Sequence, residues 1–268
     1  MKSFGFIGAG NMGSAMINAI AKKYDEDLYV YDVDAKQYEK FQQKNIKTCA
    51  DIEEVIKTCK YIVLTIKPQY YKQVCEQIKG LLAAEHVVIT VAPGFSLDDM
   101  RGLLANHPKI IRTMPNTPAF VGEGVTALCF DEKLIELEER QFIEARFEAF
   151  GKSFKIQEDQ MNAIVALSGS SPAYGYLFIE AMADAAVKFG ISRQMAYEMA
   201  ARSIKGACEM ILQTKEHPGV LKDSVTSPGG TTIAAVAKLE ETGFRHSIIS
   251  GMTACYEKAE EMSIKKGQ

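Results

Sequence analysis

Short apolar runs alternate with amphipathic stretches through the first half of the chain. The runs carry few polar residues, which indicates strands buried on both faces. Buried strands separated by helical stretches are typical of a parallel sheet covered by helices on both sides. The expected strands are Ser3 to Ile7, Leu28 to Tyr31, Tyr61 to Thr65, Val87 to Val91 and Ile110 to Thr113. We therefore predict a doubly wound, Rossmann-like α/β domain over residues 1–157, with a further strand near Val125 to Phe130 and a helix across Glu132 to Phe150.

After Gln157 the apolar residues recur at helical spacing, and the pattern requires no strand. Small residues gather in the segment 181–186, as close packing between helices demands, and the polar surface is small for an isolated domain. We predict that residues 158–268 form an all-α domain that binds substrate and dimerises, giving a homodimer or a higher oligomer of dimers. The expected helices are Gln160 to Leu167, Ala173 to Phe189, Arg193 to Gln213 and Phe244 to Ser263.

The segment after the first strand has the G-x-G-x-x-G spacing of dinucleotide-binding loops. In such loops the first glycine (Gly8) permits the turn, the second (Gly10) lets a pyrophosphate approach the backbone, and the third (Gly13) lets the helix lie against the strand. The N-terminus of the next helix then faces the phosphates. We expect the whole segment to bind a nicotinamide dinucleotide: Gly8, Ala9, Gly10, Asn11, Met12 and Gly13.

Asp32 lies at the end of the second expected strand, where a carboxylate can bind the adenosine ribose and repel a 2′-phosphate. This position favours NADH over NADPH. Two other interpretations stay open: Asp32 caps a helix that begins near Asp34, or Lys36 compensates a phosphate.

Two more loops follow expected strands, at the edge where ligands bind in such sheets. One holds Thr65, Ile66, Lys67 and Pro68, and the other holds Asn116. The simpler interpretation is that both loops are ordinary turns that contain proline. Polar groups at these strand ends can, however, orient the ribose and the nicotinamide. We expect these five residues to contact the cofactor.

A second glycine turn, Val225 to Ile233, precedes a helix expected over Ala234 to Glu241. Gly229 and Gly230 leave room for a ligand near the backbone, and a helix N-terminus attracts anions. The turn is thus a candidate site for a carboxylate or a phosphate. The simpler interpretation is an ordinary turn with Thr231 as the helix N-cap.

Composition narrows the classes of partner. The formal charge is −3 with both signs interleaved, so neither a nucleic-acid partner nor a membrane surface is expected. Met1-Lys2 leads directly into a strand, and no apolar run approaches the about 18 residues of a membrane span, so we expect a cytoplasmic protein. The six cysteines and four histidines are scattered, which predicts packed thiols and no metal site.

With these motifs, the chain resembles the pyrroline-5-carboxylate reductase family over nearly its whole length. The resemblance rests on the Gly8 to Gly13 loop, Ile66-Lys67-Pro68, Met114-Pro115-Asn116-Thr117-Pro118, Ser168 to Tyr174, and His217-Pro218-Gly219 leading into Val225 to Ile233. It implies the reduction of 1-pyrroline-5-carboxylate, a cyclic imine, to L-proline with NAD(P)H.

The resemblance also assigns roles within the second turn. It implies that the backbone N–H groups of Gly229, Gly230 and Thr231 hold the substrate carboxylate, and that Val225 and Ser227 belong to the same site. Thr232 matches the threonine that hydrogen-bonds the ring nitrogen in the family, so it is the expected catalytic residue. A threonine is a weak acid, so we expect the imine proton to come from solution or through water.

The chain departs from the family pattern in three places. Ser171 replaces a glycine, which we expect to narrow the substrate mouth; Tyr31 to Asp34 replaces a segment that often accommodates NADPH; and Asp51 to Glu53 lacks an asparagine that often contacts the ribose. Two alternative functions stay open. A 3-hydroxyacid dehydrogenase or imine reductase needs a lysine on the helix after Ser168, where none occurs before Lys188. The other alternative is a non-catalytic dinucleotide-binding regulatory protein.

Overall fold

The computed structural model describes residues 3–91 and 94–264. The chain forms two compact units. One unit extends to Ser170 and includes the C-terminal segment from Cys255, and the other comprises Ser171–Ala254. Within the described residues, no helix is long and apolar enough to cross a membrane.

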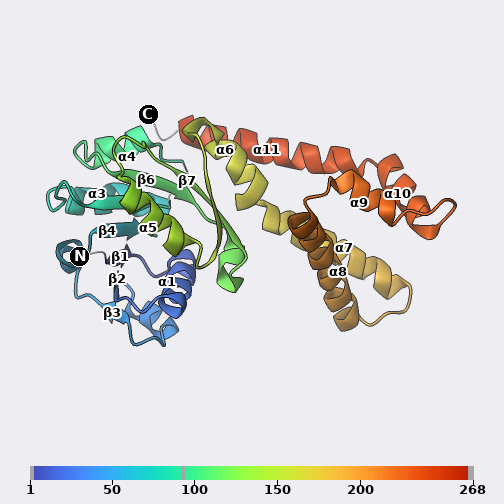
Figure 1. The fold of residues 1–268 in the computed structure, drawn as a ribbon, viewed down its shortest axis with the longest axis horizontal. Coiled ribbons are helices and arrows are strands. Elements are labelled where there is room, and N and C mark those ends of the chain that lie inside the picture. The colour runs from blue at the N-terminus through green and yellow to red at the C-terminus, as the bar shows by residue number, and fades with distance from the viewer. Residues whose placement is uncertain (1–2, 92–93, 265–268) are drawn as a thin grey trace. The chain divides into compact units, whose positions relative to one another are not determined.

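The first unit is built on one twisted sheet (Figure 1). Eight strands of the described chain take the order β3-β2-β1-β4-β5-β6-β7-β8, and only the β6–β7 pair is antiparallel. The order reverses between β1 and β4, and ligands of doubly wound sheets bind at the carboxyl ends of the strands at such a reversal. The strands are β1 Phe4–Ile7, β2 Leu28–Tyr31, β3 Ile46–Thr48, β4 Tyr61–Leu64, β5 Val87–Thr90, β6 Ile110–Met114, β7 Gly124–Cys129 and β8 Gly151–Lys155.

Helices cover both faces of this sheet, as the buried strands predict. The helices that flank the sheet are α1 Asn11–Lys23, α2 Ile52–Thr58, α3 Tyr71–Ile78, α4 Leu97–Leu103 and α5 Leu137–Phe147. One apolar core holds Met16 and Ile17 of α1 with Phe147 of α5, and a second core holds Val55 of α2 with Tyr71 of α3. The expected doubly wound domain is therefore confirmed.

The first unit continues past the expected domain boundary at residue 157. A short helix, α6 Met161–Ile164, follows β8 and leads into a π-helical turn, Val165–Gly169. Met161 is buried in the second core, beside residues of β4 and β5. Its apolar side chain therefore ties α6 to the sheet.

The sequence pattern did not predict the two edge strands of the sheet, β3 and β8. β3 and β8 contain lysine and threonine or serine and are largely exposed, so neither reads as an apolar run. A strand at the edge of a sheet is recognised by its backbone pairing, which leaves a weak sequence signal. Similarly, α5 begins at Leu137 instead of Glu132, with Glu136 forming the capping box.

The second unit is all helical. Its helices are α7 Ser171–Lys188, α8 Arg193–Thr214, α9 Pro218–Ser224 and α10 Thr231–Glu241, with the first part of α11 Phe244–Ile264. Helix α9 was not expected, and α10 begins three residues before the predicted Ala234. The remaining helices agree with the predicted pattern.

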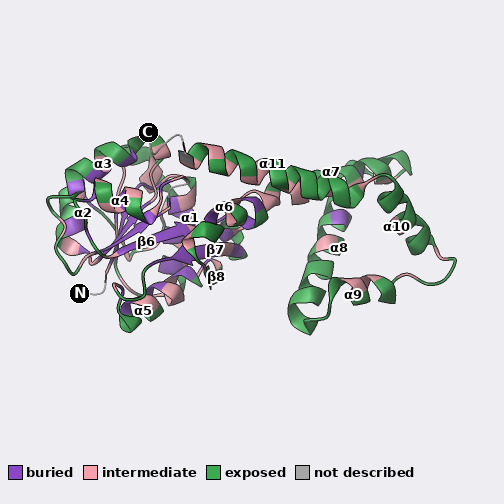
Figure 2. Ribbon diagram, turned by 90° about the horizontal axis from the view of Figure 1, so that it is seen from above, coloured by how far each residue is buried: buried purple, intermediate pink, exposed green. Residues whose placement is uncertain are grey.

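The helices of the second unit bury little apolar surface within one chain. Its buried apolar residues, among those described, are Ala183, Ala196 and Ala200. Large side chains stay exposed, including Leu177 at 68% and Ile249 at 64%. Figure 2 shows the exposed colour along most of α8 and α10. Three alanines do not form the core of a stable domain, so these helices need further packing partners.

Candidate functional site

The glycine-rich loop after β1 is fixed by contacts with the loop after β4. Gly8 has a φ of +104°, and a Cβ there would lie 2.7 Å from the Thr65 carbonyl oxygen. The Thr65 hydroxyl donates a hydrogen bond to the Gly8 carbonyl at 2.6 Å. A Cβ on Gly13 would collide with that carbonyl and with the Thr65 hydroxyl. Gly8 and Gly13 are therefore required by the protein itself.

Gly10 differs from its two neighbours in the motif. A Cβ built at Gly10 meets nothing within 4 Å, and its φ of −61° suits any residue. Gly10 is the N-cap of α1, and no side chain caps that helix. The loop thus leaves open space beside unpaired backbone N–H groups, as a bound pyrophosphate requires.

Asp32 is held beside the loop by two backbone groups. One carboxylate oxygen accepts a hydrogen bond from the Ala9 N–H at 2.6 Å, and the other accepts from the Asp34 N–H at 2.9 Å. The short helix Ala35–Lys40 is capped by Asp34, which accepts from the Lys36 N–H. Asp34, and not Asp32, is therefore the helix cap.

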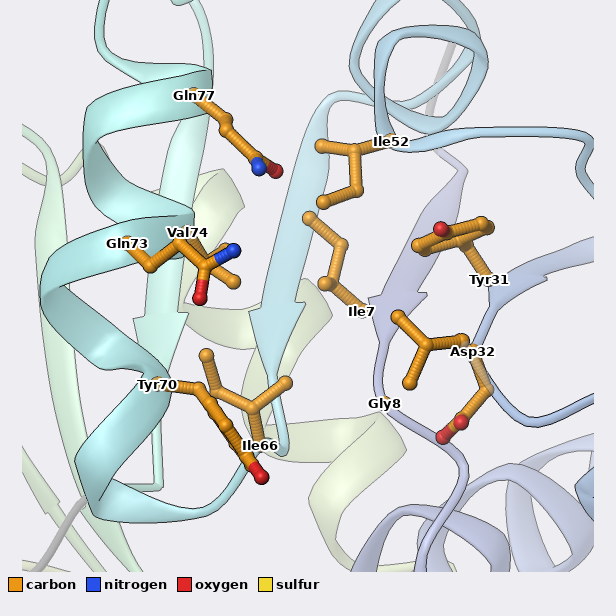
Figure 3. Close-up of a pocket in the computed structure, with 11 residues that line it drawn as sticks. Ile7, Gly8, Tyr31, Asp32, Ile52, Ile66, Tyr70, Gln73, Val74 and Gln77 are labelled. Atoms are coloured by element: carbon orange, nitrogen blue, oxygen red, sulfur yellow. The ribbon is translucent and has the colours of Figure 1, made fainter.

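A cavity of about 320 Å³ opens beside these residues (Figure 3). Gly8 and Asp32 line it on the strand side, and Ile66 lines it from the loop after β4. Helix α3 supplies Gln73 and Gln77, which project into it in Figure 3. The cavity thus continues from the phosphate loop past the carboxylate of Asp32, which fits a dinucleotide.

The remaining predicted cofactor residues lie near this edge in different ways. Lys67 is the N-cap of the short helix Pro68–Tyr70, where Pro68 takes the first position. The Asn116 amide accepts from the Val125 N–H at 2.8 Å and donates to the Ser168 carbonyl at 2.9 Å. Asn116 is only 7% exposed, so its side chain primarily joins the end of β6 to β7 and the π-helical turn.

The second glycine turn lies in the helical unit and is a tight turn. The Gly230 N–H donates to the Ser227 carbonyl at 3.0 Å, and Gly229 has a φ of +67°. Proline followed by a glycine of positive φ is the pattern of a type II turn. Gly229 is constrained by its positive φ, whereas a Cβ on Gly230 would lie 2.5 Å from the Ser227 hydroxyl and would require that side chain to move.

Helix α10 begins directly after this turn. Gly230 is its N-cap, which excludes Thr231 from that role, and no side chain caps the helix. Within the described chain, the N–H groups of Thr231 and Thr232 have no hydrogen-bond partner, whereas the Gly230 N–H is used by the turn. Thr231, Thr232 and Val225 are exposed, so donors and a threonine hydroxyl are accessible at one helix terminus.

Cys49 and Cys59 are buried free thiols of the first unit. Burial raises the pKa of Cys49 to about 11 and that of Cys59 to about 12, which keeps both thiols protonated at neutral pH. Within the residues that the structure describes, no cluster of histidine, cysteine, aspartate and glutamate could hold a metal ion.

Sequence reasoning missed the α3 side of the cavity. Tyr70, Gln73 and Gln77 face it, at helical spacing after Pro68. The signal was present, because these polar residues alternate with the buried Tyr71, Cys75 and Ile78 of α3. The sequence does not show that this polar face of α3 lines a cavity, because that depends on how α3 packs against the sheet.

Known proteins match nearly the whole length of the chain. A family model described as pyrroline-5-carboxylate reductase dimerisation matches residues 158–262, and one described as NADP oxidoreductase coenzyme F420-dependent matches residues 3–94. The chain is 40% identical to pyrroline-5-carboxylate reductase of Escherichia coli strain K12, over 98% of each chain.

Solved structures agree as well. A pyrroline-5-carboxylate reductase from Coxiella burnetii is 33% identical with a TM-score of 0.90, covering 97% of this chain and 98% of that one. The Plasmodium falciparum pyrroline carboxylate reductase, solved with NADP bound, is 30% identical with a TM-score of 0.86, covering 98% of each. The chain therefore belongs to the pyrroline-5-carboxylate reductase family.

Proposed function

We propose that this protein is an NAD(P)H-dependent oxidoreductase that reduces 1-pyrroline-5-carboxylate to L-proline. The observation that carries the proposal is the α10 terminus, where free N–H donors and the Thr232 hydroxyl occur together in a member of this family. The open loop at Gly10 supports the cofactor half of the reaction.

The glycine-rich loop and the adjoining cavity fit the cofactor. The N–H groups at the start of α1 bind the pyrophosphate, and Asp32 binds the adenosine ribose. Ala9, Asn11 and Met12 complete the loop around the phosphates. NAD(P)H, when bound, supplies the hydride. The fixed carboxylate of Asp32 disfavours a 2′-phosphate, so we propose NADH as the preferred cofactor.

The other predicted cofactor residues shape the site around the dinucleotide. Thr65 fixes Gly8, and Asn116 fixes the end of β6, so both act by positioning backbone. Ile66 lines the cavity, while Lys67 and Pro68 shape the turn after β4.

The turn before α10 binds the substrate. The carboxylate is held by the N–H groups of Gly229 and Thr231, with that of Thr232 next along the helix, and the helix dipole favours the anion. Gly230 maintains the turn through its bond to Ser227, and Val225 lies beside it. Orientation of this kind can lower the barrier by several kcal/mol.

Thr232 contacts the ring nitrogen through its hydroxyl. A hydroxyl group orients the imine but does not supply a proton readily at neutral pH. The proton on the ring nitrogen therefore comes from solution, either on the imine before binding or through water.

Two domains divide this work. We assign residues 1–157 to dinucleotide binding, because β8 ends at Lys155, and residues 158–268 to substrate binding and dimerisation. The exposed apolar residues of α7, α8 and α11 support a homodimer or a higher oligomer of dimers, since one chain leaves them uncovered. Sedimentation at micromolar concentration tests this assignment, and a monomer contradicts it.

The activity is tested by the absorbance of the reduced nicotinamide. Oxidation of NADH or NADPH should require pyrroline-5-carboxylate and should form proline in equal amount. No substrate-dependent oxidation with either cofactor contradicts the proposal and favours the non-catalytic alternative. Oxidation of NADH or NADPH by a 3-oxoacid, which is reduced to the 3-hydroxyacid, favours the dehydrogenase alternative. The described part of α7 has its lysine only at Lys188, in the last turn.

A further inference from the structure

The cavity beside Asp32 has a defined direction. Gly8 belongs to the expected phosphate loop, and Asp32 to the expected ribose contact, and both lie at one end of it (Figure 3). In a dinucleotide the base follows the ribose on the side away from the phosphate. The far part of the cavity is therefore the place for the adenine, if the proposed cofactor binding holds.

The walls of the far part are apolar. Ile7 at the end of β1 and Ile52 at the start of α2 lie on one side, and Val74 lies on the α3 side (Figure 3). Aliphatic side chains on two sides suit the flat apolar faces of a purine ring. These walls would accept any aromatic base and do not by themselves distinguish one base from another.

Two carboxamides border this apolar slot. Gln73 and Gln77 are one turn apart on α3, and both amide groups point into the cavity in Figure 3. Neither side chain has a hydrogen-bond partner or ion pair in the described structure. A glutamine amide offers one acceptor and two donors, which complement the amino group and the adjacent ring nitrogen of adenine.

We propose that Gln73 and Gln77 recognise the edge of the cofactor adenine that carries the 6-amino group. They determine base specificity and take no part in hydride transfer. The other polar side chains that line the cavity are Tyr31, Asp32 and Tyr70, and we assign Asp32 to the ribose.

The test compares equilibrium binding of NAD⁺ and its 1,N6-ethenoadenine analogue, in which the extra ring blocks that edge. We expect the wild-type protein to bind the analogue about tenfold more weakly. The double variant Gln73→Met, Gln77→Met keeps the length of both side chains and removes their polar groups. It should lose about tenfold in affinity for NAD⁺ and bind the analogue unchanged, so the ratio falls to about one.

Gln69→Met, a change of the same kind in the preceding short helix outside the cavity, should leave both affinities unchanged. Equal binding of both dinucleotides by the wild type, or an unchanged ratio in the double variant, overturns this inference and leaves the proposed reductase intact. Failure to bind any nicotinamide dinucleotide overturns both.

Discussion

A carboxylate oxygen of Asp32 accepts a hydrogen bond from the backbone N–H of Ala9 at 2.6 Å. The end of β2 is thereby joined to the glycine-rich loop after β1. Asp32 thus has two effects: it holds the loop, and it places a negative charge beside the expected ribose. A substitution that removes the charge and keeps a hydrogen-bond acceptor separates these two effects.

Asp32→Asn should shift cofactor preference toward NADPH. The asparagine oxygen can still accept from Ala9, but the repulsion of a 2′-phosphate is gone, so we expect the ratio of kcat/KM for NADPH to that for NADH to rise about tenfold. Steady-state kinetics with both cofactors measure it. Asp34→Asn is the control, since that carboxylate serves the Lys36 N–H and the Gln37 amide, and it should change the ratio less. A wild-type preference for NADPH contradicts the role given to Asp32.

The glycines of the loop should respond differently to alanine. Gly13→Ala forces a Cβ against the Gly8 carbonyl and should lower the free energy of unfolding by about 1–3 kcal/mol. Gly10→Ala meets no protein atom, so stability should hold while dinucleotide affinity falls about tenfold or more. Urea denaturation and a fluorescence titration measure the two effects. Full affinity in Gly10→Ala would mean that the open space binds no pyrophosphate.

Thr232→Ala should reduce turnover and leave cofactor affinity unchanged. Loss of the contact to the ring nitrogen should lower kcat about tenfold or more, while Thr232→Ser should keep most of it. Thr242→Ala is the matched control at the other end of α10, where the hydroxyl donates to the Lys238 carbonyl. If Thr232→Ala turned over like the wild type, Thr232 would have no part in the mechanism.

His107 should make the fold less stable in acid. Burial lowers its pKa below the ordinary 6.5, against the opposing effect of its hydrogen bond to the His86 carbonyl, and the neighbouring His86 and Lys109 lower it further. The unfolded chain therefore takes up the proton first as the pH falls below about 6.5, and stability decreases until the folded pKa is reached.

His107→Gln keeps a donor near the same carbonyl and cannot titrate. The urea midpoint of unfolding should decrease between about pH 7.5 and about pH 5.5, and the decrease should be larger for the wild type than for this variant. Both proteins keep His86 and Lys109, so their contributions cancel in the comparison. Equal losses in the two proteins would show that His107 does not cause the acid sensitivity.

The sequence predicted the central strands and the two glycine turns because their signals are local. Phe4–Ile7 and Tyr61–Leu64 are apolar throughout, and Gly8 to Gly13 has fixed spacing. The sequence pattern did not predict β8, because Gly151–Lys155 carries two lysines and lacks an apolar run. The strand is recognised by its pairing with β7.

The side-chain partners within the site could not be read from the sequence. Nothing in the spacing indicates that Asn116 binds Val125 and Ser168, or that the Gly230 N–H is taken by Ser227. These partners depend on the packing of distant segments and on the exact start of α10. The same reason applies to Gln73 and Gln77, whose face of α3 is set by tertiary structure.

The central claim is that a hydride passes from the nicotinamide to the imine carbon of pyrroline-5-carboxylate. Mass spectrometry of the product formed from reduced cofactor deuterated at the transferable position tests it most directly. The account predicts proline that carries one deuterium on the former imine carbon, at a rate reduced in Thr232→Ala. Unlabelled proline, or no proline at all, would contradict it.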